Sequence, residues 1–540
     1  MSKILRSKFW TYLFVLFVVS FIMPFFHLGD NLVPLDYYML VIVNIFAFFA
    51  ITSIALFMKG RQEKIYLTIV FLLSIAPNCL VFAYLLLTGT YMYNDQYWVI
   101  FASNASESRE YISEFVSLPL VLGVLAYIVV GGFLLFKSGS SLSLQRKEHR
   151  LWYGFSILII LLIISLQYLS TTMCIIDFYK SGVRYFWESH KMQKEAAMRK
   201  AHPIPVDCVL SDSTNHTFVV VLGESLTRSH MDIYGYFRPT TPHLESMRDE
   251  LLIYRDVVSP STHTIGVMKY LLTFAHHDHP EYYFDKPSIV DIFNYAGFET
   301  YWISNQEIIS KWGGNYGIIA QGADHLVDLS IVRQPDEIVL ASLDQALKKK
   351  TERKKIIFIH TMGNHHSYVC RYPNSYEHFD FGKDPLQEKS YYNDFMRKTI
   401  DEYDNSILYT DYVVSSIIER VKAENESSFV LFLSDHGEEV NDFRPFCGHS
   451  SSSSFQCEVP LILWRSEQYQ KEMGSLDIDS LRPFSTEHLI HSLSTLAGLR
   501  YDDYIPEFSL FDSTFVPQRR MVAEIEYQEV VRRTQEQMQN

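Results

Sequence analysis

The stretch Thr217-Phe218-Val219-Val220-Val221-Leu222-Gly223-Glu224-Ser225 decides the fold of this 540-residue chain. Its apolar, largely β-branched run is too short for a helix and is uniformly hydrophobic, which is typical of a strand buried on both faces of a parallel sheet. Runs of the same kind occur at 356–359 and 429–433, and a further strand is expected at 300–303. The pattern therefore predicts a sheet with buried parallel strands at its centre.

Helical stretches separate these strands. We expect helices at 288–296, 336–349, 403–421 and 486–497. Strands that alternate with helices indicate an α/β layered domain, which we place at 215–540. In such sheets, ligands bind beyond the carboxyl ends of the strands, so the residues that follow each strand are the candidates for a functional site.

Carboxylates and imidazoles follow three of the predicted strands. Glu224 follows the first, His365 lies just after the second, Asp435 and His436 follow the third, and His449 comes shortly afterwards. Glu, Asp and His are ligands that zinc accepts, whereas a structural zinc site is expected to use Cys. Each residue alone is explained by an ordinary turn or helix-capping acid. Their coincidence predicts a metal site, and the spacing leaves the metal open.

A hydroxyl-rich turn, 259–264, leads into a helical stretch at 267–274 and contains both Thr262 and Thr264. A hydroxyl at a helix N-terminus lies where the backbone N–H groups favour phosphate. Beside a metal ion such a hydroxyl can become a nucleophile. Simple N-capping is the alternative interpretation.

The first third of the chain contains nearly all the long apolar runs. Five runs lack Lys, Arg, Asp and Glu in their interior and are each about as long as a bilayer-spanning helix, namely 9–26, 37–58, 65–87, 118–136 and 151–169. The first could be a signal peptide, but bulky residues occupy the place of a cleavage site, so we interpret it as a retained span. We therefore expect an N-terminal five-helix transmembrane bundle at 1–170.

Charge indicates how the chain is oriented and what it binds. Basic residues gather before the first run, between the second and third, and between the fourth and fifth, which predicts a cytoplasmic N-terminus and an exported 215–540 domain. The segment 171–214 is a connector whose aromatic residues suit a helix at the membrane surface, although a solvated linker helix explains it equally well. The net charge of −14 argues against nucleic-acid binding.

Several motifs together resemble the phosphoethanolamine transferases of Gram-negative envelopes, which belong to the alkaline phosphatase/sulfatase superfamily. The resemblance is carried by segments spread over the whole exported domain: 221–225, 234–236, 238–242, 360–365, 409–412 and 434–438. Five N-terminal spans followed by a periplasmic catalytic domain also match that family. The resemblance thus covers nearly the whole chain.

The resemblance implies roles for the candidate residues. Glu224, Thr264, Asp435 and His436 would hold one catalytic zinc, and Thr264 rather than Thr262 would become phosphoethanolaminylated. The resemblance gives the remaining candidates substrate or second-zinc roles: His365 and His449 would contact the phosphoryl group or a second zinc, and Asn305 would contact substrate.

The implied activity is transfer of phosphoethanolamine from phosphatidylethanolamine to lipopolysaccharide, through a phosphoenzyme on Thr264, at the bacterial inner membrane. A phosphoglycerol transferase of the same superfamily and a catalytically inactive membrane scaffold are the alternatives. A transporter is disfavoured because the interiors of the predicted spans lack ionisable residues.

The chain also departs from part of that family. The colistin-resistance branch usually has cysteines flanking the nucleophile turn, and none occurs here. The turn and the stretch 371–373 are more similar to the branch that modifies core heptose, so both core heptose and lipid A remain open as acceptors. Cys447 and Cys457 are candidates for a disulfide across the loop that bears His449.

Overall fold

The structure is a computed structural model that describes most of the chain beyond residue 173 and parts of the first third. The described residues are 58, 61–88, 92, 97, 100–101, 116–137, 174–210, 215–308, 315–332, 334–384, 386–449, 453–474, 476 and 479–539. They fall in two compact units, Met1–Trp187 and Glu188–Asn540.

Unit 1 contains two described long helices, α3 (Arg61–Thr88) and α6 (Leu118–Lys137). They pack against each other through the rings of Phe71 and Tyr127, whose centroids are 6.2 Å apart. None of the helices that the structure describes is both long and apolar enough to cross a membrane. The expected spans 65–87 and 118–136 fall on α3 and α6, and the expected spans 9–26, 37–58 and 151–169 lie outside the described residues except for Met58.

The expected connector contains one long helix, α8 (Cys174–Ala201), and the division between the units falls within it. Phe186 and Trp187 are exposed, whereas Tyr185 and Met192 are buried. Of these four large side chains of the connector, two therefore lie at the surface of the protein. The end of α8 is fixed to unit 2, because Arg199 forms an ion pair with Asp291 at 3.1 Å. The interfacial position of this helix stays a prediction.

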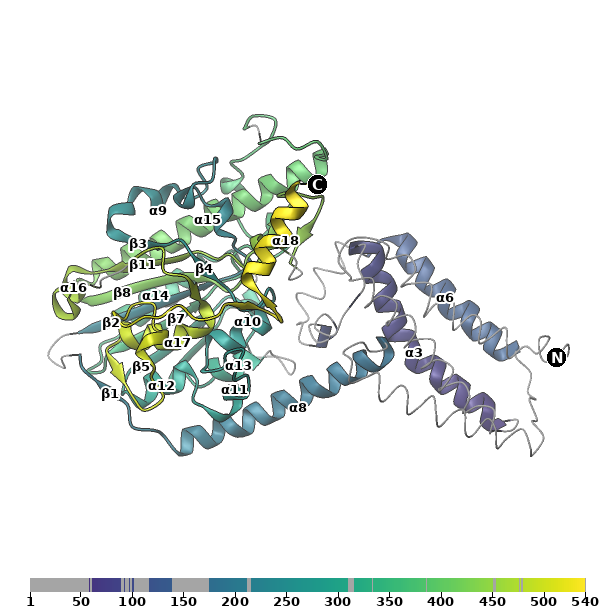
Figure 1. The fold of residues 1–540 in the computed structure, drawn as a ribbon, viewed down its shortest axis with the longest axis horizontal. Coiled ribbons are helices and arrows are strands. Elements are labelled where there is room, and N and C mark those ends of the chain that lie inside the picture. The colour runs from purple at the N-terminus through teal and green to yellow at the C-terminus, as the bar shows by residue number, and fades with distance from the viewer. Residues whose placement is uncertain are drawn as a thin grey trace. The chain divides into compact units, whose positions relative to one another are not determined.

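Unit 2 is built on a seven-stranded sheet in the order β3-β11-β8-β2-β7-β5-β6 (Figure 1). The strands are β2 (His216–Gly223), β3 (Leu251–Tyr254), β5 (Glu299–Ser304), β6 (His325–Asp328), β7 (Lys355–His360), β8 (Ser427–Ser434) and β11 (Leu461–Arg465). β8, β2, β7 and β5 are parallel, as predicted, β6 adds a further parallel strand, and β11 is antiparallel to β8 and β3. All residues of β2, β5, β7 and β8 are buried.

Helices cover both faces of this sheet. The helices of unit 2 after α8 are α9 (Pro242–Ser246), α10 (Thr264–Leu271), α11 (Tyr282–Asp285), α12 (Ile289–Tyr295), α13 (Asn315–Ala320), α14 (Ile338–Lys348), α15 (Asp394–Ala423), α16 (Glu467–Met473), α17 (Leu489–Leu496) and α18 (Tyr527–Gln539).

Short two-residue strands form separate pairs outside the seven-stranded sheet. These pairs are β1 (Asp207–Cys208) with β13 (Leu499–Arg500), β4 (Val257–Val258) with β12 (Phe484–Ser485), β9 (Glu439–Val440) with β10 (Cys447–Gly448) and β14 (Met521–Val522) with β15 (Ile525–Glu526).

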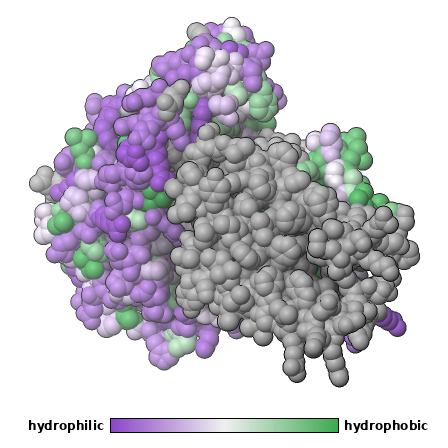
Figure 2. All heavy atoms as spheres, turned by 45° about the vertical axis from the view of Figure 1, so that its right-hand side comes forward, coloured by the Kyte–Doolittle hydropathy of each residue, from purple (hydrophilic) through white to green (hydrophobic). Residues whose placement is uncertain are grey.

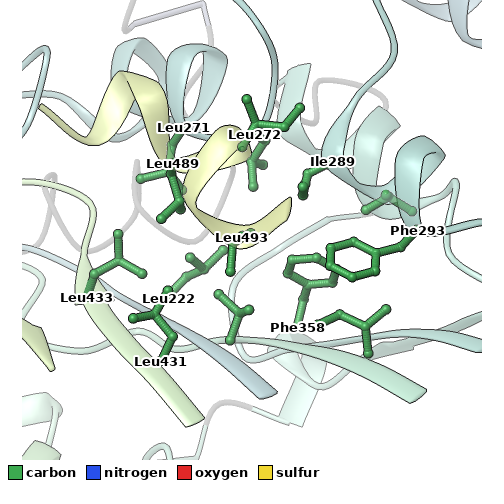
Figure 3. Packing of buried hydrophobic residues seen from close by; sticks show 14 of the residues in the cluster. Leu222, Leu271, Leu272, Ile289, Phe293, Phe358, Leu431, Leu433, Leu489 and Leu493 are labelled. Carbon is green, nitrogen blue, oxygen red and sulfur yellow. The ribbon is translucent and has the colours of Figure 1, made fainter. Parts of the chain in front are cut away.

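Alternate residues of each central strand pack on opposite faces, because side chains alternate along a strand. Leu222 of β2 and Phe358 of β7 belong to one core with α10, α12 and α17, and Figure 3 shows these helices over that face. Val221 of β2 and Ile359 of β7 belong to the other core, with α14 and α15. The side of unit 2 seen in Figure 2 is mainly hydrophilic, with isolated hydrophobic residues.

The four expected helices are present, with shifted ends. Ser288 and Asp291 form a capping box that starts α12. α15 begins nine residues before the expected start, at Asp394, where Asn393 caps it by accepting a hydrogen bond from the Met396 N–H. The region 486–497 is divided into a 3₁₀ turn (Thr486–His488) and α17.

Candidate active site

The candidate site lies where the central parallel strands end. Gly223 of β2 pairs with Ser434 of β8, so the next residues, Glu224 and Asp435, leave the sheet side by side. The register between β7 and its neighbours brings the loop after His360 to the same edge. Side chains distant in sequence therefore converge here, as expected for a parallel α/β sheet.

Three of the predicted ligands form one cluster. Glu224, Asp435 and His436 each offer a ligand atom within 4.8 Å of the others, and their exposed fractions are 1%, 1% and 0%. His436 Nε2 lies 3.3 Å from Glu224 Oε1 and 3.5 Å from Asp435 Oδ2. Although Asp435 Oδ2 is buried, it has no hydrogen-bond partner among the described residues. Two carboxylates and one imidazole with an unsatisfied buried oxygen fit a zinc ion.

The three groups also perturb one another electrostatically. Burial and the neighbouring Glu224 carboxylate raise the pKa of Asp435 well above its usual value. Burial opposes ionisation of Glu224, but His436 outweighs it and lowers the pKa of this carboxyl. Burial likewise disfavours charge on His436, yet Asp435 and Glu224 raise its pKa to about 10. Without a metal the cluster therefore retains protons, because two buried carboxylates repel each other.

Thr264 is the first residue of α10 and faces this cluster. Its Oγ1 lies 3.1 Å from both Glu224 oxygens and 3.4 Å from His436 Nε2. The helix N-cap is His263, and no side chain caps the helix, so the Thr264 hydroxyl does not serve as a cap. The structure brings Glu224, Thr264, Asp435 and His436 together, as the sequence predicts, and favours Thr264 over Thr262, which is fully buried.

Close backbone contacts fix the position of Glu224. Ser225 adopts a left-handed conformation with φ 54°, and its N–H donates to Asp435 Oδ1 at 3.1 Å. The Asn364 N–H donates to the Glu224 carbonyl at 2.9 Å. A Cβ at Gly363, where φ is 49°, would lie 2.7 Å from the Glu224 nitrogen, so the loop after β7 needs glycine at this point.

His449 lies beside the cluster and is oriented by a carboxylate that the sequence reasoning did not single out. His449 Nδ1 is 2.7 Å from Glu438 Oε2, and the His449 and His436 ring centroids are 4.5 Å apart. Glu438 is fully buried and also accepts a hydrogen bond from the Tyr368 hydroxyl at 2.8 Å. Glu438, His436 and His449 form a second candidate metal group.

His365 approaches the same site from the loop after β7. Burial lowers its pKa to about 4, partly offset by the Glu224 carboxylate, so the ring is neutral at pH 7. Its Nδ1 is buried without a hydrogen-bond partner among the described residues. A neutral imidazole with an unused nitrogen can accept a proton or bind a metal.

The expected substrate contact, Asn305, has another role. Its amide donates to Asp336 Oδ1 at 2.9 Å and to the Gln334 carbonyl at 2.9 Å. The adjacent Gln306, which the sequence reasoning missed, instead donates to Glu224 Oε2 at 3.0 Å. The sequence places both amides directly after the strand at 300–303, next to the expected site. It does not tell which of the two side chains turns toward the site.

Cys447 and Cys457 are not paired with each other. The Cys447 sulfur lies 3.2 Å from the Tyr368 hydroxyl, and Cys457 is buried in a separate cluster with Val258 and Tyr527. The candidate disulfide is therefore absent, because the two thiols pack into different neighbourhoods.

The structure is an α/β protein with a candidate metal group and a threonine hydroxyl at the carboxyl edge of its parallel strands. The family model described as Sulfatase matches residues 216–499, which include the whole central sheet and every residue of the cluster. The chain belongs to the sulfatase family.

The chain is also similar to individual proteins, which are more specific than the family model. The chain is 29% identical over 516 residues to "Phosphoethanolamine transferase EptC" of Escherichia coli (strain K12), covering 88% of this chain and 87% of the relative. The zinc complex of the C-terminal periplasmic domain of EptC from Escherichia coli is 31% identical, with a TM-score of 0.57 over 60% of this chain and 95% of that domain. The fold of the integral membrane protein EptA from Neisseria meningitidis matches 93% of this chain and 98% of that chain, with a TM-score of 0.69 at 18% identity.

Proposed function

We propose that this protein is a zinc-dependent phosphoethanolamine transferase that uses phosphatidylethanolamine as donor and lipopolysaccharide as acceptor. The observation that carries the proposal is the threonine hydroxyl at the start of α10, placed 3.1 Å from both oxygens of a buried carboxylate in a three-residue metal group. The likeness to a phosphoethanolamine transferase along 88% of the chain supports it.

Glu224, Asp435 and His436 would hold the zinc ion, with Thr264 beside it. When bound, zinc supplies charge that favours the ionised threonine hydroxyl and offsets negative charge on the phosphoryl oxygens. The likeness to a zinc-containing EptC domain supports this choice of metal. His436, Glu438 and His449 form a second candidate group that shares His436 with the first, so we propose one zinc ion, or two that compete for this ligand.

The first half of the reaction transfers the head group to the enzyme. Thr264 Oγ1 forms a bond to the phosphorus of phosphatidylethanolamine, the bond from phosphorus to the glycerol oxygen breaks, and a proton completes the diacylglycerol that leaves. The His449 ring lies beside the cluster and keeps one nitrogen for such a proton, because Glu438 engages only Nδ1.

The second half regenerates the threonine. An acceptor hydroxyl or phosphate oxygen on lipopolysaccharide forms the new bond to phosphorus, and the bond to Thr264 Oγ1 breaks. The same imidazole that delivers a proton in the first half removes one from an acceptor hydroxyl in the second, as microscopic reversibility requires. The acceptor is a core heptose or lipid A.

The proposal includes a membrane location. Five apolar runs precede unit 2, and the fold likeness to an integral membrane protein extends over 93% of the chain. We place the chain in the bacterial inner membrane with unit 2 in the periplasm. A membrane anchor would hold unit 2 close to both lipid substrates and so raise their effective concentration at the active site.

The test is a lipid assay with purified full-length protein in detergent and zinc. We expect diacylglycerol release from phosphatidylethanolamine and, when lipopolysaccharide is added, a phosphoethanolamine increment on it by mass spectrometry. Release of diacylglycerol from phosphatidylglycerol alone would favour the phosphoglycerol transferase instead. Absence of release from either lipid would favour an inactive scaffold.

A further inference from the structure

The carboxylate of Glu224 is held at both ends by neutral donors. The Ser225 hydroxyl donates to Oε1 at 2.9 Å, and the Gln306 amide nitrogen donates to Oε2 at 3.0 Å. The Thr264 hydroxyl lies between them, 3.1 Å from each oxygen. The orientation of this carboxylate is therefore set before any metal or substrate binds.

Gln306 is itself rigidly placed. Its amide nitrogen also donates to the Thr361 carbonyl at 2.9 Å, so both N–H bonds of the amide are engaged. Its backbone N–H donates to the Ser304 hydroxyl at 3.1 Å, and the same hydroxyl lies 2.9 Å from its carbonyl oxygen. The side chain is only 5% exposed. These contacts leave Gln306 little freedom to serve a different partner.

We propose, on the basis of the proposed zinc-dependent function, that Gln306 is a positioning residue that aligns Glu224 for the metal. Hydrogen bonds from neighbouring residues orient a carboxylate that binds a metal, and such outer contacts typically contribute 10- to 100-fold in metal affinity or activity. A neutral amide suits this role, because it donates to the carboxylate without competing for the metal.

Asn305, the residue before Gln306, helps to fix the position of Glu224 through its main chain. Asn305 donates to Asp336, and Asp336 accepts hydrogen bonds from the N–H groups of Met362 and Gly363 at 2.9 and 2.8 Å. That loop packs on the Glu224 backbone. The end of β5 thus fixes the Glu224 main chain through Asn305 and its carboxylate through Gln306.

The test measures zinc affinity and kinetics on full-length protein. Gln306→Met removes the donor while keeping side-chain volume, and Gln306→Glu replaces the donor by a carboxylate of the same shape. We expect Gln306→Met to weaken zinc binding to the metal-stripped protein by about 10- to 100-fold in chelator competition. Gln306→Glu should weaken it at least as much. At saturating zinc, kcat should fall while KM for phosphatidylethanolamine stays within about twofold.

The matched control is Asn405→Leu. Asn405, on α15, is another buried amide, but its oxygen accepts hydrogen bonds from the N–H groups of His378 and Phe379 and not from a group at Glu224. This variant should lose thermal stability and keep wild-type zinc affinity. Unchanged zinc affinity in both Gln306 variants would overturn the inference, as would a raised KM with unchanged zinc affinity, which would make Gln306 a substrate contact. Wild-type protein that neither binds zinc nor releases diacylglycerol would instead contradict the proposed function.

Discussion

Thr264 Oγ1 and the Glu224 carboxylate are hydrogen-bonded although 40 residues separate them in sequence. Glu224 follows β2, whereas Thr264 starts α10, which packs on the sheet through Leu271 and Leu272 (Figure 3). The helix is thus held by the core at one end and presents its hydroxyl at the other. The proposed nucleophile is thus held in place by the fold and is not a mobile surface hydroxyl.

Replacing the nucleophile should separate activity from folding. Thr264→Ala removes the attacking oxygen, so we expect transfer to fall by about a thousandfold or more. Thermal unfolding should change little, because the hydroxyl does not cap α10. Thr264→Ser keeps an oxygen and should retain measurable transfer. Diacylglycerol release and circular dichroism check both points, and wild-type turnover by Thr264→Ala would exclude this residue.

Removing one proposed metal ligand should affect zinc-loaded protein much more than metal-free protein. Burial and Glu224 raise the pKa of Asp435 and favour its neutral form without metal, so Asp435→Asn should change the unfolding temperature of the metal-free protein little. Zinc affinity should fall by more than about 100-fold, because a direct ligand matters more than an outer contact. Calorimetry of both forms provides the measurement.

A matched acid tests whether that effect is specific. Asp411 is also buried, but it accepts hydrogen bonds from the His243 and Leu244 N–H groups at the start of α9. Asp411→Asn should lower stability and leave zinc affinity at the wild-type value. Equal zinc affinities in the Asp435 and Asp411 variants would contradict the ligand assignment.

The Glu438 carboxylate should act through His449. Glu438→Gln keeps the shape but weakens the hold on His449 Nδ1, so we expect kcat to fall by about 10- to 100-fold. His449→Gln should cost more, about 100- to 10,000-fold, because it removes the proton-transfer group itself. The double variant should be no slower than His449→Gln. Additive losses would mean that Glu438 has a separate role, such as binding a second zinc.

A buried histidine away from the metal cluster predicts a pH-dependent stability. His230 contacts Asp404 at 2.8 Å and Asp442 at 2.9 Å. Burial opposes its charge, but Asp442 and Asp404 raise its pKa to about 10. Because the folded-state pKa lies above the unfolded value, the stabilisation is present below pH 6.5 and is lost as the pH rises toward 10. The full contribution is on the order of a few kcal/mol.

Urea unfolding at pH 6.5 and pH 9.5 checks this expectation. The free energy of unfolding should fall more between these values in wild-type protein than in His230→Gln, which lacks the titrating group. Asp442→Asn should begin to lose stability at a lower pH than wild type, since one source of the raised pKa is gone. Equal pH dependence in all three proteins would show that His230 is neutral when buried.

The sequence predicts the centre of the fold and the metal cluster for the same physical reason. Strands buried on both faces give uniform apolar runs, and the register of parallel strands forces Glu224 and Asp435 to one edge. The sequence analysis did not single out β11 or the early start of α15, although both carry local signals: 461–464 is a short apolar run, and Asn393 caps α15.

The outer contacts of the site depend on turns that the sequence does not specify. Asn305 and Gln306 are adjacent amides, and successive side chains at a strand end point in different directions, so the sequence singles out Asn305 but not Gln306, the amide that contacts Glu224. Glu438 meets His449 because β9 and β10 pair and fold the chain back. The candidate Cys447–Cys457 disulfide, which the sequence leaves open, is absent for a similar reason: the sequence distance is short, but the two thiols pack in separate clusters.

The most direct measurement is peptide mass spectrometry of full-length protein incubated with zinc and phosphatidylethanolamine in the absence of acceptor. We expect one phosphoethanolamine group on Thr264, which disappears when lipopolysaccharide is added. A modification on Thr262, or continued transfer to lipopolysaccharide with no modified threonine at any time, would contradict it.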